Sequence, residues 1–224
     1  MVHAYPRTLV FDLDGTLVDT SADLCASLNH VLRRYARPEV DPDTVRHLVG
    51  HGARALIQRG LALAGEDDPA LVEEAVPYFL RYYADHIADG SQPYAGVEAA
   101  LDELADAGVV TAVCTNKPEA LARRLIGAMG WDRRFAAILG GDSLSVRKPD
   151  AAHVLGTIEA AGGAADSSVF VGDSSVDVAA ARAARVPVVV VSFGFADIAP
   201  ADLGADAVID HYDALLPLLR RRPW

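Results

Sequence analysis

The amino-acid sequence predicts an α/β protein, in which a parallel sheet carries an all-helical insertion after its first strand. Two observations support this fold class. Short apolar runs alternate with helical periodicity from residue 97 onward, as expected for parallel strands joined by helical crossovers. One further apolar run lies at residues 8–11, and the intervening segment 18–90 shows helical periodicity alone. The sequence therefore predicts a core domain formed by residues 1–17 and 91–224 and a helical domain formed by residues 18–90.

The first strand is predicted at Thr8 to Phe11, because this run is apolar and Gly15 marks its end. Asp12 and Asp14 then lie at the carboxyl end of the strand, where open α/β sheets bind their ligands. Two carboxylates so close together repel each other unless a cation sits between them. This pattern indicates a hard metal ion.

Two other readings of the Asp12 segment remain open. It could be a surface Asp-Gly turn, or it could be a calcium loop. The calcium loop is the weaker reading, because it needs Gly at position 17 and Glu at position 23 and does not follow a buried strand.

The insertion is predicted to contain helices near 21–36, 42–48, 53–64 and 69–87. Thr20 with Asp23 suggests a capping box, and Asp41 and Asp68 each precede a proline, as N-cap residues often do. Pro77 predicts a kink or break near 73–77. The breaker residues at 88–93 suggest an inter-domain linker.

The second half of the chain shows alternating strands and helices, with glycines at 108 and 130 after two of the helices. Strands are predicted at 109–114, 136–139, 169–171, 187–191 and 207–209. Helices are predicted at 97–107, 121–129, 151–161, 176–184 and 215–219.

Composition excludes several classes of protein. The formal charge of -11 argues against a nucleic-acid partner or an anionic membrane surface, which require clustered basic residues. Cys25 and Cys114 have no spacing typical of a zinc site or a disulfide framework. Residues 1–8 contain no apolar leader, and no run approaches ~18 apolar residues. We therefore expect a soluble cytoplasmic protein without a membrane partner.

Four motifs follow one another at predicted strand ends or helix starts: Phe11-Asp-Leu-Asp-Gly-Thr-Leu, Thr115-Asn116, Lys148-Pro149 and Gly172-Asp-Ser-Ser-Val-Asp177. Their order and spacing resemble those of the haloacid dehalogenase superfamily of phosphotransferases. The resemblance spans nearly the whole chain, and it implies a Rossmann-like core with a helical cap over the active site.

By this resemblance, Asp12 attacks phosphorus to form an aspartyl-phosphate, and Asp14 protonates the leaving oxygen and later activates water. The implied cofactor is Mg²⁺, which prefers hard oxygen ligands. Its implied ligands are Asp12, the backbone carbonyl of Asp14, and Asp173. Asp177 is expected to orient a water or Lys148.

Thr115, Asn116 and Lys148 are implied to bind the transferring phosphoryl group. Each also has an ordinary structural reading: Thr115 and Asn116 could cap the following helix, and Lys148 could be a solvated loop lysine. The chain departs from the family pattern at Ala151, where many relatives have the second proline of Lys-Pro-x-Pro. We expect this departure to loosen the loop without removing charge.

The substrate prediction depends on the segment from His47 to Arg54, which resembles the phosphoglycolate phosphatase branch of the family, as does Gly140-Gly-Asp142. The expected substrate is a small phosphorylated metabolite, 2-phosphoglycolate first, with His51 and Arg54 as candidate carboxylate contacts. A simple helix-helix turn is the structural alternative for this segment. A sugar-phosphate phosphatase or phosphomutase and a catalytically inactive binding module remain open alternatives. The oligomeric state, monomer or homodimer, cannot be read from the sequence.

Overall fold

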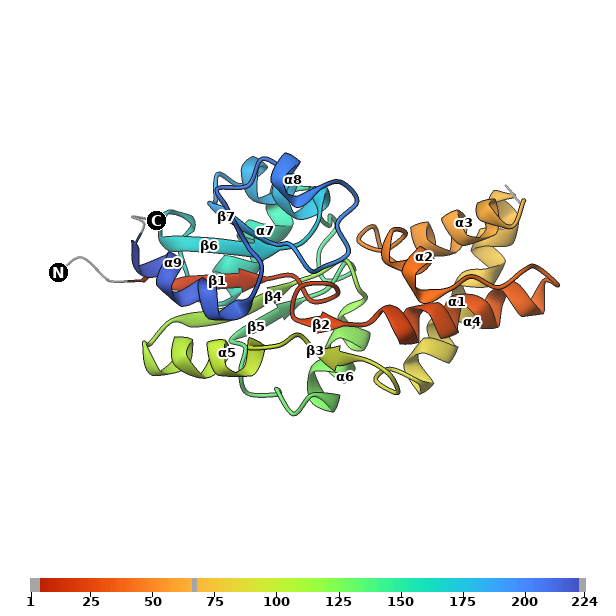
Figure 1. Cartoon of the computed structure of the whole chain (residues 1–224), viewed down its shortest axis with the longest axis horizontal. Coiled ribbons are helices and arrows are strands. Elements are labelled where there is room, and N and C mark those ends of the chain that lie inside the picture. The colour runs from red at the N-terminus through yellow and green to blue at the C-terminus, as the bar shows by residue number, and fades with distance from the viewer. Residues whose placement is uncertain (1–4, 66–67, 222–224) are drawn as a thin grey trace.

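The computed structural model describes residues 5–65 and 68–221, and it contains the predicted parallel sheet (Figure 1). Six parallel strands lie in the order β5-β4-β1-β6-β7-β8. Their bounds are β1 Thr8–Phe11, β4 Val110–Cys114, β5 Ala137–Leu139, β6 Ser168–Gly172, β7 Val188–Val191 and β8 Ala207–Ile209. The first strand of the chain is therefore a central strand, and it pairs with β4 on one side and β6 on the other.

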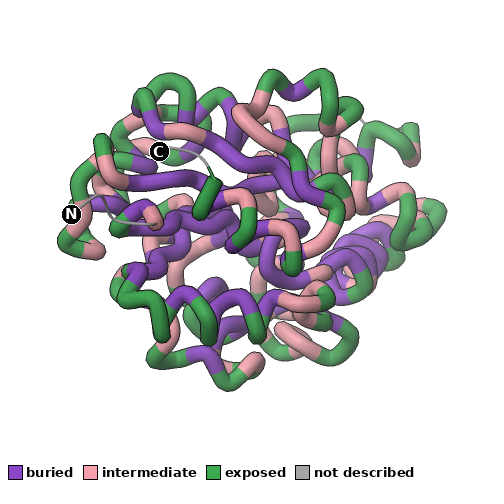
Figure 2. The backbone as a smooth tube through the Cα atoms, turned by 60° about the vertical axis from the view of Figure 1, so that its left-hand side comes forward, coloured by how far each residue is buried: buried purple, intermediate pink, exposed green. Residues whose placement is uncertain are grey.

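Helices cover both faces of this sheet, because the strand side chains alternate between two apolar clusters. Leu9 and Phe11 of β1 face one cluster, and Val10 faces the other. The first face is covered by α5 (Val97–Asp106), α6 (Glu119–Ala128) and α9 (Leu215–Arg221), and the second by α7 (Ala151–Ala160) and α8 (Ser175–Ala183). Figure 2 shows the central strands as continuous buried stretches.

The insertion forms four helices at one end of the molecule, beyond the carboxyl ends of the strands (Figure 1). They are α1 Ser21–Arg34, α2 Pro42–Arg46, α3 Ala53–Leu63 and α4 Pro69–Asp85. Leu28, Ile57 and Phe79 lie in a cluster of their own, which Leu121 from α6 joins. The helical insertion is thus confirmed, whereas the domain limits 1–17, 18–90 and 91–224 stay a prediction.

The predicted capping contacts of Asp41 and Asp68 are confirmed, and that of Thr20 is wrong, although α1 begins at Ser21 as predicted. Asp41 accepts a hydrogen bond from Thr44 N, and Asp68 accepts one from Ala70 N. Thr20 makes no side-chain cap on α1, because its hydroxyl donates to Asp14 instead. A tertiary contact has here displaced the local capping bond.

Helix α4 runs through Pro77 without the predicted break. An interior proline costs ~3 kcal/mol in an isolated helix. In this helix Val72 and Ala75 before the proline and Phe79 and Tyr83 after it are all buried in the same cluster. Packing on both sides of Pro77 holds the helix together.

Two chain crossings connect the insertion to the core. Val18–Asp19 (β2) and Gln92–Pro93 (β3) pair antiparallel, and this pair was missed because two-residue strands carry no periodicity. Asp23, which the sequence placed in a capping box, is instead buried and accepts hydrogen bonds from Gly90 N (2.9 Å), Ser91 N (2.8 Å) and Ser91 Oγ (2.5 Å). Its carboxylate therefore fastens the outgoing chain to the first helix of the insertion.

The two cysteines are free and buried, as expected for small apolar side chains. Within 5–65 and 68–221, no helix has the length and apolar character that crossing a membrane requires.

We expect Asp23→Ala to lower the free energy of unfolding by roughly 2–4 kcal/mol, because it leaves the buried N–H and hydroxyl of Ser91, and the N–H of Gly90, without an acceptor. Urea denaturation followed by circular dichroism measures this change. Asp89→Ala, which removes an exposed partner of His86, is the control and should stay close to the unmodified protein. Equal midpoints for the two variants would show that the Asp23 contacts contribute little.

Candidate active site

The predicted site residues meet at the carboxyl edge of the sheet, around the end of β1. Asp12 and Asp14 follow β1, Thr115 and Asn116 follow β4, and Asp173 follows β6. Because these three strands are adjacent and parallel, their ends lie side by side. The remaining predicted residues come from the loop before α7 and from the first turn of α8: they are Lys148 and Asp177.

A buried acidic cluster forms the centre of this site. Asp12, Asp173 and Asp177 each present a carboxylate oxygen within 4.8 Å of the others. Lys148, which is 3% exposed, places its Nζ 2.8 Å from Asp12 Oδ1 and 2.7 Å from Asp177 Oδ1. Two of the three buried carboxylates therefore pair with the same lysine.

The pKa values of Asp12 and Asp173 are raised, because these carboxylates are buried close to other negative charges. Burial raises the pKa of Asp12 to about 7, with Lys148 opposing the shift. Burial and the charges of Asp177 and Asp12 raise the pKa of Asp173 well above its usual value. Adding a divalent cation would favour the ionised carboxylates, so the donor set fits a hard metal ion.

Asp177 is engaged on both of its oxygens. Burial would raise its pKa, but Lys148 and the hydrogen bonds outweigh burial and lower it. Oδ2 accepts from Asp173 N, Ser174 N and Ser174 Oγ, which completes the capping box of α8. This carboxylate thus orients Lys148 and the Asp173 loop.

Asp173 is held in place by the chain around it. Its Oδ1 accepts from Thr16 Oγ1 (3.2 Å), and its Oδ2 accepts from Phe195 N (2.5 Å). Gly15 has a φ of 82°, and a Cβ at this position would collide with the Asp173 carboxylate. The glycine after Asp14 is therefore required both by the turn and by the approach of Asp173.

Asp14 makes its side-chain contacts with a different set of residues. Its Oδ1 accepts from Thr20 Oγ1 at 2.7 Å and lies 2.8 Å from Lys117 Nζ. The two aspartates of the first motif thus have separate cation partners, Lys148 for Asp12 and Lys117 for Asp14.

Lys117 is a site residue that the sequence reasoning missed. Its side chain is 4% exposed, and its Nζ donates to Tyr83 Oη at 2.7 Å. Burial opposes its charge, but Asp14 and Tyr83 outweigh burial and raise the pKa of Lys117. Its position in the sequence could have identified it, because it directly follows Thr115 and Asn116 at the end of a predicted strand.

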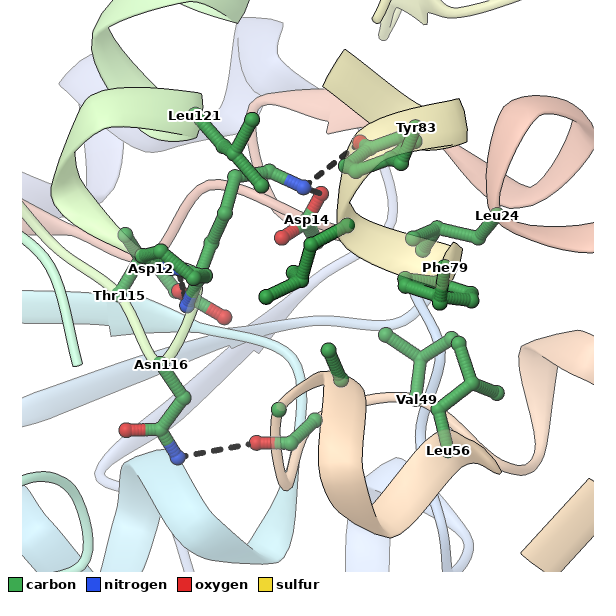
Figure 3. Close-up of a pocket in the computed structure, with 16 residues that line it drawn as sticks. Asp12, Asp14, Leu24, Val49, Leu56, Phe79, Tyr83, Thr115, Asn116 and Leu121 are labelled. Atoms are coloured by element: carbon green, nitrogen blue, oxygen red, sulfur yellow. Dashed lines mark hydrogen bonds and ion pairs between the residues drawn. The ribbon is translucent and has the colours of Figure 1, made fainter. Parts of the chain in front are cut away.

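Thr115 and Asn116 do not cap α6, because that helix begins at Glu119. Thr115 Oγ1 accepts from Lys117 N, and Asn116 Nδ2 donates to Lys148 O and to Gly50 O, both at 3.1 Å. The amide of Asn116 therefore ties the Lys148 loop and the insertion to the end of β4, and Figure 3 shows its contact with the insertion.

A cleft of about 40 Å³ opens between the strand ends and the insertion (Figure 3). Asp12, Asp14, Thr115 and Asn116 form its polar end. Apolar side chains form the opposite wall: Leu24, Val49, Leu56, Phe79, Leu80 and Leu121. Tyr83 is part of the helical core and also lines the cleft.

Neither of the two predicted carboxylate contacts, His51 and Arg54, lines this cleft. Arg54 pairs with Glu73, and both side chains are at least half exposed. His51 lines a neighbouring cleft together with Arg59 and Arg147. The segment that contains these residues instead contributes Val49, Gly50, Gly52 and Ala53 to the first cleft.

His153 holds the Lys148 loop through a hydrogen bond. It is fully buried, and its Nδ1 accepts from Lys148 N at 3.2 Å. Burial and the neighbouring Lys148 charge lower the pKa of His153 to about 4, so the ring is neutral at pH 7.

Comparisons with known proteins agree with this architecture. Residues 9–191 match the family described as haloacid dehalogenase-like hydrolase. The chain is 47% identical to a phosphoglycolate phosphatase of Agrobacterium fabrum, over 94% of this chain and 91% of the relative. It is 45% identical to one of Mesorhizobium japonicum, over 96% and 95%. A crystal structure of a predicted phosphoglycolate phosphatase from Haemophilus somnus superposes with a TM-score of 0.89 at 31% identity, covering 95% of this chain and 97% of that one.

We expect stability to fall as the pH decreases from about 6.5 to about 4, in part because of His153. In this window the unfolded chain binds a proton at His153 that the folded chain does not, so the free energy of unfolding decreases as the pH is lowered. His153→Gln, which cannot titrate, should flatten this slope in urea titrations between pH 4.5 and 7. An unchanged slope would show that other groups account for the acid sensitivity.

Proposed function

The chain belongs to the haloacid dehalogenase-like hydrolase family, and we propose that it hydrolyses 2-phosphoglycolate to glycolate and phosphate with Mg²⁺ as its cofactor. It is a phosphoric monoester hydrolase that acts on small phosphorylated compounds. The observation that carries the proposal is the position of Asp12, buried at the strand end beside Lys148 and facing a small cleft that it shares with Asp14.

The proposed metal ligands are the carboxylates of Asp12 and Asp173 and the backbone carbonyl of Asp14. The clustered carboxylates and the raised pKa values of Asp12 and Asp173 support them. Bound Mg²⁺ would supply the charge that lets an anionic carboxylate approach an anionic phosphate. The role proposed for Asp177 is to orient Lys148, with which it forms an ion pair.

The proposed first step forms a bond between an Asp12 carboxylate oxygen and phosphorus, while the bond from phosphorus to the ester oxygen breaks. Asp14 gives its proton to the leaving oxygen, which departs as the glycolate hydroxyl. Because the two side chains have separate cation partners, one can act as nucleophile while the other moves a proton.

The second step returns the enzyme to its starting state. Asp14, now ionised, takes a proton from water, and the water oxygen attacks phosphorus. The bond to Asp12 breaks and phosphate leaves. Thr115 and Lys148 are proposed to donate to the phosphoryl oxygens in both steps through their side chains, which their positions around Asp12 support. Asn116 is proposed to donate through its backbone N–H, because its side-chain amide already donates to Gly50 O and Lys148 O.

The helical insertion is proposed to act as the cap, with residues 18–90 selecting the leaving group. The insertion lines the first cleft with apolar side chains such as Leu24, Leu56 and Phe79, which give the hydroxyl groups of a sugar no hydrogen-bond partner. This counts against the sugar-phosphate alternatives. The complete set of Asp12, Asp14, Lys148 and Asp173 counts against an inactive binding module.

The proposal is tested by turnover of a panel of phosphomonoesters in Mg²⁺. We expect kcat/KM to be highest for 2-phosphoglycolate, and well above the values for glucose 1-phosphate and p-nitrophenyl phosphate. EDTA should abolish turnover, Mg²⁺ should restore it, and Ca²⁺ should restore it poorly, because Ca²⁺ accepts looser geometry. Faster turnover of a sugar phosphate, or isomer formation from it, would refute the substrate assignment.

Asp12→Asn and Asp14→Asn should fail in different ways. The first should abolish formation of the aspartyl-phosphate, whereas the second should slow both steps by ~10²–10⁴-fold, the usual contribution of a positioned acid or base. Rapid quench with labelled substrate, followed by peptide mapping, measures the intermediate. Label recovered on a residue other than Asp12 would overturn the assignment.

A further inference from the structure

The only cationic side chain that lines the first cleft, within the described part of the chain, is Lys117. We propose, on the basis of the proposed function, that the Lys117 ammonium and the Tyr83 hydroxyl bind the carboxylate of the leaving group. Lys117 is then the residue that selects a phosphate ester bearing a carboxylate, in place of the Arg54 and His51 that the sequence suggested.

Burial and contacts make Lys117 suitable for this role. Its Nζ lies between Asp14 Oδ1 and Tyr83 Oη, at 2.8 and 2.7 Å. An ammonium has three N–H donors, and these two described contacts use two of them. A buried charge also interacts more strongly with a ligand than an exposed one, because water does not screen it.

The walls of the cleft leave a carboxylate few places to bind. On the insertion side the lining is apolar and includes Leu24, Leu56 and Phe79, so a charged group there would lose its hydration without gaining a partner. At the other end, Thr115 and Asn116 lie next to Asp12, where the phosphoryl group is proposed to bind. Among the side chains that line the cleft, Lys117 and Tyr83 supply the remaining donors.

The distance between Lys117 and Asp14 also matches the chemistry of the substrate. In glycolate one carbon separates the ester oxygen from the carboxylate carbon. A cation that binds this carboxylate must therefore lie next to the group that protonates the ester oxygen. Lys117 Nζ meets this requirement, because it lies 2.8 Å from the Asp14 carboxylate.

Because Tyr83 belongs to the insertion, the proposed carboxylate site depends on the position of the insertion. It lies on α4 and packs in the helical cluster with Phe79, whereas Lys117 lies on the loop after β4 (Figure 3). The carboxylate site is therefore complete only while the helices cover the strand ends. Arg54 cannot replace Lys117, because it is paired with Glu73 outside the cleft.

The test compares 2-phosphoglycolate with ethyl phosphate, in which a methyl group replaces the carboxylate. The measured quantity is the ratio of the two kcat/KM values. In Lys117→Met we expect this ratio to fall on the order of 10–100-fold, mostly through KM for 2-phosphoglycolate, because a charged hydrogen bond is lost. Tyr83→Phe keeps the ring and should lower the ratio several-fold.

Arg54→Met is the matched control and should leave the ratio unchanged. If the unmodified enzyme shows no preference for 2-phosphoglycolate, the proposed function fails. If it does show the preference and Lys117→Met retains it, the function stands and the role of Lys117 is overturned. Should Lys117→Met not fold, as judged by circular dichroism, Tyr83→Phe decides: an unchanged ratio would overturn the proposal.

Discussion

The crowding of negative charge at the end of β1 is the constraint on which the site depends. Asp12, Asp173 and Asp177 are buried within a few ångströms of one another, and within residues 5–65 and 68–221 Lys148 is the one cation paired with them. Such an arrangement destabilises a fold, because burial and mutual repulsion both disfavour ionised carboxylates. The surrounding chain reduces this cost through the amide of Phe195, the hydroxyl of Thr16 and the N-terminus of α8.

The same constraint separates the tasks within the site. Lys148 faces Asp12 and Asp177 at the phosphoryl end, and Lys117 faces Asp14 at the end where the leaving group is proposed to lie. An acidic chain with a net charge of -11 thus buries two lysines beside the carboxylates around which the phosphate ester is proposed to bind.

The sequence predicted the sheet, the helical insertion and the grouping of the site motifs, because these depend on local patterns. Apolar runs ended by Asp or Asn marked β1, β4 and β6, and the fold rule for parallel sheets brought their ends together. Contacts between distant segments could not be read in this way. Thr20 and Asp23 had the pattern of a capping box, yet they bind Asp14 and the returning chain at Gly90 and Ser91.

At the site, the contact between Lys117 and Tyr83 could not be predicted either, because it joins distant segments of the chain. Tyr83 had the helical spacing of a packing residue, and it does pack in that core, but its hydroxyl also reaches a lysine from the other part of the chain. Arg54 had the expected charge and the expected neighbourhood in sequence, but Glu73 on α4 holds it outside the cleft. The direction of the side chain decided both cases, for Tyr83 on α4 and for Arg54 on α3, and this direction depends on tertiary packing.

The central position of β1 has a consequence for how the chain folds. Residues 8–11 are synthesised before their partners, residues 110–113 and 168–171. This buried strand therefore waits, with both edges unpaired, until those segments are made. The helices of the insertion make mainly local contacts and can form during this delay, which brings residues 19 and 92 together and shortens the loop that must close before β1 meets β4.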